Sequence, residues 1–178
     1  DLVLVVPRGG RIAGRVLDAE GRPAPPGVPV GALGVGAYSP DEGWRGFGMT
    51  QADGRFEITG LGEHVFEVQP GGGLSAYLGE TATDVKPGTE DLALRVSLGV
   101  ALEGTLVDAQ GAPVSTTSLS ADDGTRRAAM RPYVQVGPDG RFRLQGLKAG
   151  PVRLFLMRGS KQGAAGERDP GCPTHRQH

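Results

Sequence analysis

The sequence predicts an all-β protein that contains two β-sandwiches in tandem, and three observations support this prediction. Short apolar runs alternate with polar residues, as in strands with one buried face. Glycine accounts for 31 of the 178 residues and separates these runs, which is typical of a turn-rich β protein. Two phrases, ADGRFEITGL at 52–61 and PDGRFRLQGL at 138–147, repeat one another, and no segment shows a long helical periodicity.

The repeat extends well beyond the DGRF phrases. The stretch RIAGRVLDAEGRPAP, from Arg11, matches ALEGTLVDAQGAPVS, from Ala101, at an offset of 90 residues. The same offset places DLVLVV at 1–6 on DLALRV at 91–96, whereas the DGRF phrases match at an offset of 86. The second copy is therefore expected to be four residues shorter between these motifs.

The strands follow from the alternation and from the turn residues between them. In the first unit we expect strands near 11–17, 28–35, 45–50, 54–59, 64–69, 76–85 and 91–96. In the second unit we expect them near 100–107, 114–120, 130–136, 140–145 and 151–158. Each full sandwich is thus expected to have about seven short strands.

The two copies indicate which side of each strand faces the core. In 12–16 and 102–106, every second residue is apolar or glycine in both copies, whereas the residues between them change type. After each DG, a phenylalanine and an aliphatic residue two positions later recur, whereas Glu57 becomes Arg143. Because successive strand side chains point to opposite faces, the constant face is expected in the core and the variable face in solvent.

The DGRF phrases are interpreted as turns that open a strand. An Asp-Gly pair before an alternating run favours a hairpin turn, with glycine supplying a positive φ. A calcium site is not expected at Asp53 or Asp139, since the second phrase lacks a nearby second carboxylate. Arg55 and Arg141 fall on the variable face, and the sequence gives no physical reason why both are arginine.

These patterns divide the chain into four parts. Residues 10–98 form the first β-sandwich repeat and residues 99–159 the second, while 1–9 are the final strand of a preceding repeat or a linker. Residues 160–178 are expected to be a disordered tail, because they show no strand or helix pattern. This tail replaces the last strand of the second repeat, so whether that repeat is complete stays open.

Several motifs in order resemble a known family. GRVLDAEGRPAPPGVPV followed by TQADGRFEITGL, and GTLVDAQGAPV followed by VGPDGRFRLQGL, resemble the carboxypeptidase regulatory-like domain, a transthyretin-like (prealbumin-like) Greek-key β-sandwich. The chain departs from the family pattern in details. His64 stands at the position of a family glycine, and Phe66 and Val152 stand at that of a tyrosine.

The resemblance implies a non-catalytic module of a larger exported bacterial protein, secreted, periplasmic or at the cell surface. Such domains occur in tandem, and here they would act as a spacer or presenter. The expected partners are a cell-surface glycan or protein and neighbouring repeats of the same chain. The opening DLVLVV, without a methionine, also looks like part of a longer protein.

Composition argues against other classes of protein. The formal net charge of −1 gives no general attraction to nucleic acid, and no apolar run approaches the roughly 20 residues that a membrane helix needs. The single cysteine, Cys172, excludes an intrachain disulfide. Of the three histidines only His64 lies outside the tail, so no catalytic triad or metal site is expected. We therefore predict no enzyme activity, no metal and no cofactor.

The loop at 31–50, GALGVGAYSPDEGWRGFGMT, differs most between the two units. It supplies the candidate ligand-binding residues Tyr38, Asp41, Glu42, Trp44 and Phe47. Exposed rings and carboxylates suit a sugar or a peptide, which makes a carbohydrate- or peptide-binding module the alternative function. The other interpretation is that Trp44 or Phe47 packs into the end of the sandwich or against the second unit, because aromatic residues bury much area. The arginines of the corresponding stretch are expected in a solvated turn; they are Arg126, Arg127 and Arg131.

Overall fold

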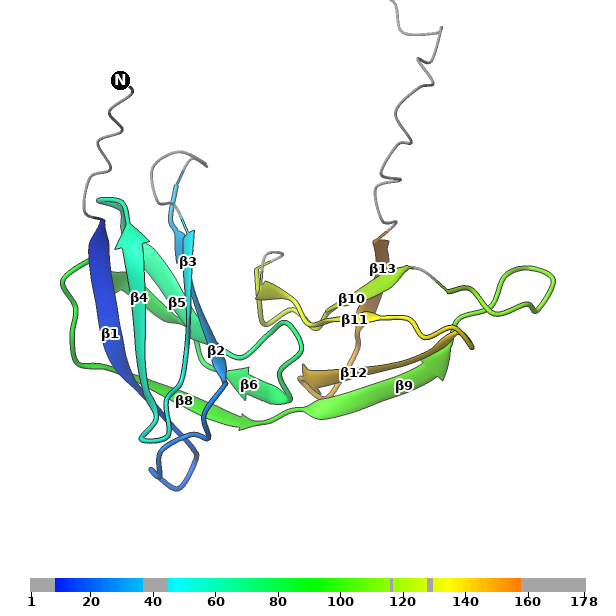
Figure 1. Cartoon of the computed structure of the whole chain (residues 1–178), viewed down its shortest axis with the longest axis horizontal. Coiled ribbons are helices and arrows are strands. Elements are labelled where there is room, and N and C mark those ends of the chain that lie inside the picture. Colours follow the sequence, from blue (N-terminus) through cyan, green and yellow to red (C-terminus); the bar gives the residue numbers. More distant parts are fainter. Residues whose placement is uncertain (1–8, 37–44, 116, 128–129, 158–178) are drawn as a thin grey trace, which may run out of the picture.

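The computed structural model describes residues 9–36, 45–115, 117–127 and 130–157. Thirteen β-strands make up nearly all of their regular structure, so the predicted all-β class is confirmed. The strands fall into two groups, β1–β8 and β9–β13, which we call the first and the second sandwich (Figure 1).

The first sandwich has two four-stranded sheets, in the orders β4-β1-β8-β6 and β3-β2-β5-β7. Its strands are β1 (Gly10–Leu17), β2 (Pro29–Gly34), β3 (Arg45–Met49), β4 (Arg55–Leu61), β5 (Phe66–Pro70), β6 (Tyr77–Gly79), β7 (Ala82–Val85) and β8 (Leu92–Leu98). Every pair is antiparallel except β1 and β8, which run parallel. The inward side chains form one core around Ile12, Phe56 and Phe66.

The second sandwich has fewer strands in its described part. They are β9 (Val100–Thr105), β10 (Ser118–Asp122), β11 (Tyr133–Gln135), β12 (Arg141–Leu147) and β13 (Arg153–Met157). One sheet has the order β11-β10-β13 and the other consists of β12 and β9. Its core is smaller and is centred on Leu119, Leu144 and Leu147.

Five strands of each sandwich occupy matching places. The order β4-β1 facing β3-β2-β5 in the first sandwich corresponds to β12-β9 facing β11-β10-β13 in the second. Even the register agrees. In the first sandwich, Arg15 pairs with Arg55, Gly14 with Phe56 and Ile12 with Ile58. The corresponding residues of the second sandwich pair in the same way: Thr105 with Arg141, Gly104 with Phe142 and Leu102 with Leu144. Each pair of strands then contains one irregularity before its last pairing.

The DGRF turns explain the two matching arginines. In each turn the aspartate accepts a hydrogen bond from the arginine backbone N–H, and the glycine has a positive φ of 75° or 78°. The arginine side chain then returns to the same aspartate, with Arg55 Nε 3.3 Å from Asp53 and Arg141 Nε 3.5 Å from Asp139. Both side chains are exposed, so these ion pairs add little stability and serve mainly to shape the turn.

The strand expected at 76–85 is two strands. β6 pairs with β8 in one sheet, whereas β7 pairs with β5 in the other. Glu80 and Thr81 lie between them, where the chain passes from one sheet to the other. A continuous apolar alternation cannot reveal such a passage, because both strands keep a period of two.

The parallel contact between β1 and β8 depends on Gly14. A Cβ added there would lie 2.0 Å from the carbonyl oxygen of Leu92. At the corresponding Gly104, the nearest atom to an added Cβ is the ring tip of Phe142, at 2.8 Å. A ring can rotate away from such a contact, whereas a strand backbone cannot.

We therefore expect Gly14→Ala to lower the free energy of unfolding by about 1–3 kcal/mol, the usual cost of overpacking. Gly104→Ala is the matched control and should change it by less than about 1 kcal/mol. Urea unfolding followed by circular dichroism measures both variants. An equal loss in the two variants would contradict the close approach of β8 to Gly14.

Candidate functional site

The two sandwiches meet through the segment between β5 and β6 and the loop between β10 and β11. Gly73 forms an isolated bridge with Pro132, and the Tyr133 N–H donates to the Gly73 carbonyl at 3.1 Å. Gly99, which lies between β8 and β9, donates its N–H to the Ala76 carbonyl at 2.9 Å. A backbone hydrogen bond therefore joins the sandwiches directly, and another attaches the covalent connection to the first sandwich.

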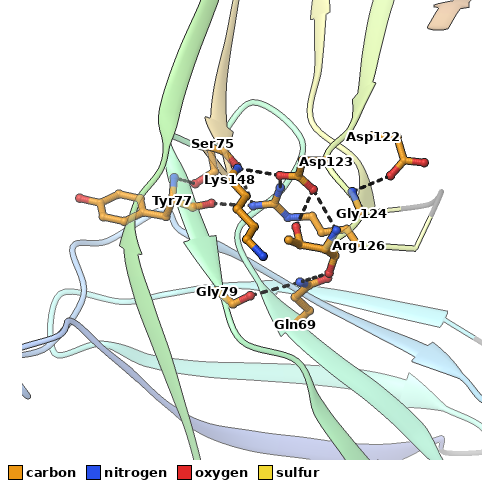
Figure 2. Close-up of polar contacts among 11 residues, drawn as sticks. Gln69, Ser75, Tyr77, Gly79, Asp122, Asp123, Gly124, Arg126 and Lys148 are labelled. Carbon is orange, nitrogen blue, oxygen red and sulfur yellow. Dashed lines mark hydrogen bonds and ion pairs between the residues drawn. The ribbon is translucent and has the colours of Figure 1, made fainter. Parts of the chain in front are cut away.

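Arg126 lies among polar groups at the centre of this junction (Figure 2). Its side chain is fully buried, with 0% exposed. Its Nη2 donates to the Tyr77 carbonyl of the first sandwich at 3.2 Å and to the Gly146 carbonyl of the second at 2.8 Å. One guanidinium thus connects backbone groups from both sandwiches. Hydrogen bonds that involve a charged group are the stronger kind, which suits this position.

Asp123 balances the charge of Arg126, at 3.4 Å from Nη1, and its side chain is 2% exposed. Its carboxylate also accepts hydrogen bonds from the Thr125 hydroxyl at 2.6 Å and from the Lys148 backbone N–H at 2.8 Å (Figure 2). Burial alone would raise the pKa of Asp123, but these hydrogen bonds and the nearby guanidinium outweigh it and hold the pKa below its ordinary value.

Burial acts on the partner too. It lowers the pKa of Arg126, and the Asp123 charge opposes this effect. An arginine nevertheless stays protonated in proteins, so the junction contains a buried ion pair. Such a pair costs desolvation energy and is retained only where both groups have further hydrogen bonds.

Further contacts surround Arg126; Gln69 is buried, whereas the Arg127–Glu67 contact is partly exposed. The Gln69 side-chain amide donates to the Gly79 carbonyl at 3.2 Å and to the Thr125 carbonyl at 3.3 Å. Arg127 makes a two-pronged contact with Glu67, through Nε and through Nη2, the latter at 2.6 Å. The hydrogen bond from Arg127 lowers the pKa of Glu67.

Several hollows flank the junction, and two of them are distinguished by their lining. The smaller, of about 200 Å³, is lined by Glu67, Gln69 and the 124–127 segment. The larger, of about 450 Å³, we call the apolar groove. It extends over both sandwiches and is lined by Gly27, Pro29, Phe47, Met49, the segment 71–75, Met130, Arg131 and Tyr133. Phe47, Met49, Leu74 and Tyr133 are all exposed there, so apolar surface faces solvent.

One of the candidate residues predicted from sequence lies in this groove. Phe47 is in β3 and is 55% exposed, so it does not pack into the end of the sandwich. The remaining four candidates, Tyr38, Asp41, Glu42 and Trp44, lie outside the described residues. The groove also contains Tyr133 and Leu74, which the sequence analysis did not single out.

The three arginines of the second unit differ from the expected solvated turn. Arg126 is buried, and Arg131 is partly buried, with Nη2 at 2.5 Å from Asp122 and its guanidinium over the Phe155 ring. Only Arg127 is half exposed. The signal for a buried cluster was the run DDGTRR at 122–127, where two aspartates precede two arginines at a spacing that lets them pair.

The described residues contain no group of three or more His, Cys, Asp or Glu side chains that could hold a metal ion. Within that same part of the chain, no helix is long and apolar enough to cross a membrane. His64, the histidine considered as a catalytic base, lies edge-on to the Phe66 ring, with centroids 6.1 Å apart.

Comparisons with known proteins place this fold in no family. No family model matches the chain, and no curated protein matches it. Among solved structures, a streptococcal ancillary pilin is similar, with 13% sequence identity and a TM-score of 0.37. The alignment covers 85% of this chain and 54% of the pilin, so the chain spans about half of the pilin's length. The resemblance to the carboxypeptidase regulatory-like domain stays a prediction.

The buried ion pair predicts a large effect of Arg126→Ala. The change removes both carbonyl contacts and leaves Asp123 as a buried carboxylate without its cation, so we expect a loss of about 3–5 kcal/mol in unfolding free energy. Arg127→Ala, at the exposed edge, is the matched control and should cost about 1 kcal/mol or less. Urea unfolding measures both, and a small effect of Arg126→Ala would contradict the central role of this side chain.

Acid should weaken the junction. Because the pKa of Asp123 is lower in the folded chain than its unfolded value near 4, the carboxylate stabilises the fold above about pH 4, and this stabilisation is lost as the pH falls below it. Glu67 acts in the same direction. Asp123→Asn should therefore show a smaller fall in its urea midpoint between pH 5 and pH 2 than the unmodified chain. An unchanged pH dependence would contradict this account.

Proposed function

We propose that this chain is a non-catalytic structural and interaction module of an exported bacterial protein. Residues 10–98 and 99–159 form two tandem transthyretin-like sandwiches that act together as a rigid spacer or presenter. The observation that carries the proposal is the buried Arg126, whose guanidinium binds carbonyls of both sandwiches. The matching strand order and register of the two sandwiches support the tandem arrangement.

The connection between the sandwiches supports rigidity as well. β8 ends at Leu98 and β9 begins at Val100, and Figure 1 shows one running almost directly into the other. A Cβ added to the intervening Gly99 would lie 2.5 Å from the backbone of Gly146. Neighbouring domains normally move relative to one another unless a specific interface holds them. Here the linker itself is packed, so bending would have to break the interface.

The rigid spacer is tested by rotational diffusion. Backbone nitrogen relaxation in solution should show β1–β8 and β9–β13 tumbling as a single elongated body. Arg126→Ala should let the two parts reorient separately, whereas the control Arg127→Ala should keep one body. Independent tumbling in the unmodified chain would overturn the proposal.

A second candidate function is ligand binding in the apolar groove. The observation that favours it is the exposure of Phe47 from the first sandwich and Tyr133 from the second in one groove, which Arg131 also lines. Two rings at a shared hollow can stack on a sugar or hold an extended peptide, and a guanidinium can bind an acidic group.

This alternative is tested with a panel of glycans and peptides, using the fluorescence of the single tryptophan, Trp44, and calorimetry. A ligand that binds should lose affinity at least about 10-fold in Phe47→Ala and Tyr133→Ala, as expected for aromatic anchors. Arg22→Ala, in an exposed turn, is the control. Binding that neither groove substitution weakens would exclude the groove as the site.

A further inference from the structure

The second sandwich has an open sheet edge where the first has a parallel strand. In the first sandwich, β8 lies along β1 in the register Gly14 to Leu92, Arg15 to Ala93 and Val16 to Leu94. In the second, the described residues place no strand beside the same edge of β9. β1 continues through Leu17, whereas β9 ends at Thr105, although apolar residues follow it.

Among the described residues, no strand covers the core of the second sandwich at this place. In the first sandwich, Leu94 and Val96 of β8 are buried in one core with Val68 of β5. The sequence repeat places Leu154 of β13 at the position of Val68. Val68 is fully buried, whereas Leu154 is 45% exposed and Leu156 is 57% exposed. The exposed apolar residues of β13 thus lie where a strand of the β8 type would cover them.

The open edge keeps the features that accept a parallel strand. Gly104 corresponds to Gly14, the residue whose missing side chain lets β8 approach. Leu106 donates its N–H to the Gly140 carbonyl, on the β12 side. Because successive N–H groups of a strand point in opposite directions, the N–H of Thr105 faces the open edge.

We propose that residues Asp1–Val6 of a second copy of this chain bind along the open edge of β9. Their sequence, DLVLVV, matches DLALRV at 91–96, which contains most of β8. Applying the β8 register places Leu2 beside Gly104, Val3 beside Thr105 and Leu4 beside Leu106. Leu4 and Val6 then take the positions of the buried Leu94 and Val96. Addition of a strand to a free edge is an established mode of recognition.

Distance prevents the chain's own residues 1–6 from reaching this edge, so we assign the strand to a second copy. Gly88 donates its N–H to the Arg11 carbonyl, so β1 begins beside the turn that precedes β8. From Leu92 to Thr105 the chain extends about 40 Å along β8 and β9, at about 3.3 Å per residue. The three residues that connect Val6 to β1 reach at most about 11 Å. The chain's own segment 158–178 contains no Val, Ile, Leu or Phe, so it lacks the side chains that the edge requires.

Such a contact joins unlike surfaces, residues 1–6 of one copy and the second sandwich of the next. Head-to-tail contacts of this kind do not close on themselves unless the rotation forms a ring, so they generate linear chains. This property goes beyond the spacer function, and it would persist if the ligand-binding alternative were correct.

The test uses residues 1–178 and compares a donor variant, Leu4→Asp, with an acceptor variant, Thr105→Pro. Sedimentation should show concentration-dependent assemblies for the unmodified chain and monomers for each variant alone. A mixture of the two variants should form a 1:1 complex and nothing longer, since one supplies the intact edge and the other the intact strand. Monomers at all concentrations in the unmodified chain would overturn the proposal.

Two controls distinguish strand addition from association through the apolar groove and from misfolding of the acceptor variant. Leu74→Asp places a charge in the groove, so loss of assembly in that variant would show that copies associate through the groove and would overturn the proposal.

Proline at 105 could also disturb folding, so the register is tested separately by Val3→Cys together with Thr105→Cys in a Cys172→Ser background. Oxidation should link copies into a covalent ladder. The control pair Val3→Cys with Arg22→Cys should not, and equal linking of both pairs would overturn the register.

Discussion

The relation between the two sandwiches depends on the burial of one guanidinium. Arg126 is removed from water, and Asp123 balances its charge. Its Nη2 donates to one carbonyl of each sandwich, those of Tyr77 and Gly146. Opening the junction would take the Tyr77 carbonyl away from Arg126, whereas Asp123 and the Gly146 carbonyl belong to the second sandwich and would stay beside the guanidinium. The ion pair therefore acts less as a source of stability than as a support that holds the guanidinium toward the Tyr77 carbonyl of the first sandwich. The buried Nε of Arg126 has no hydrogen-bond partner among the described residues.

The apolar and polar parts of the junction have different consequences. The apolar groove lies beside the ion pair, and Met130 and Arg131 of the β10–β11 loop line it together with the 71–75 segment. Its walls come from both sandwiches, so its width is set by the junction. A ligand site in the groove would be pre-formed rather than assembled on binding, which reduces the entropic cost of association.

Much of the fold could be predicted from the sequence, because the repeat supplies an internal comparison. The positions of the strands followed from alternation, and the inward faces of Ile12 and Phe56 followed from residues that match in both copies. The division of 76–85 into two strands could not be predicted from the sequence, since the alternation is the same on either side of Glu80. The junction between the sandwiches could not be predicted from the sequence either. Arg126 lies in a loop where the copies differ, and its burial depends on Tyr77 and Gly146, which are remote in sequence. Of the predicted ligand-binding residues, Phe47 is exposed at the groove, and the other four stay predictions.

The parallel pairing of β1 with β8 also has a mechanical consequence. The chain enters the first sandwich at the start of β1 and leaves it at the end of β8, and these two points lie at opposite ends of the same pair of strands. Tension along the molecule therefore pulls the two strands past each other and loads their hydrogen bonds together, instead of opening them one after another from an end. A module held under tension gains resistance from this geometry without any additional contact, and single-molecule pulling on the two ends of the first sandwich measures it directly.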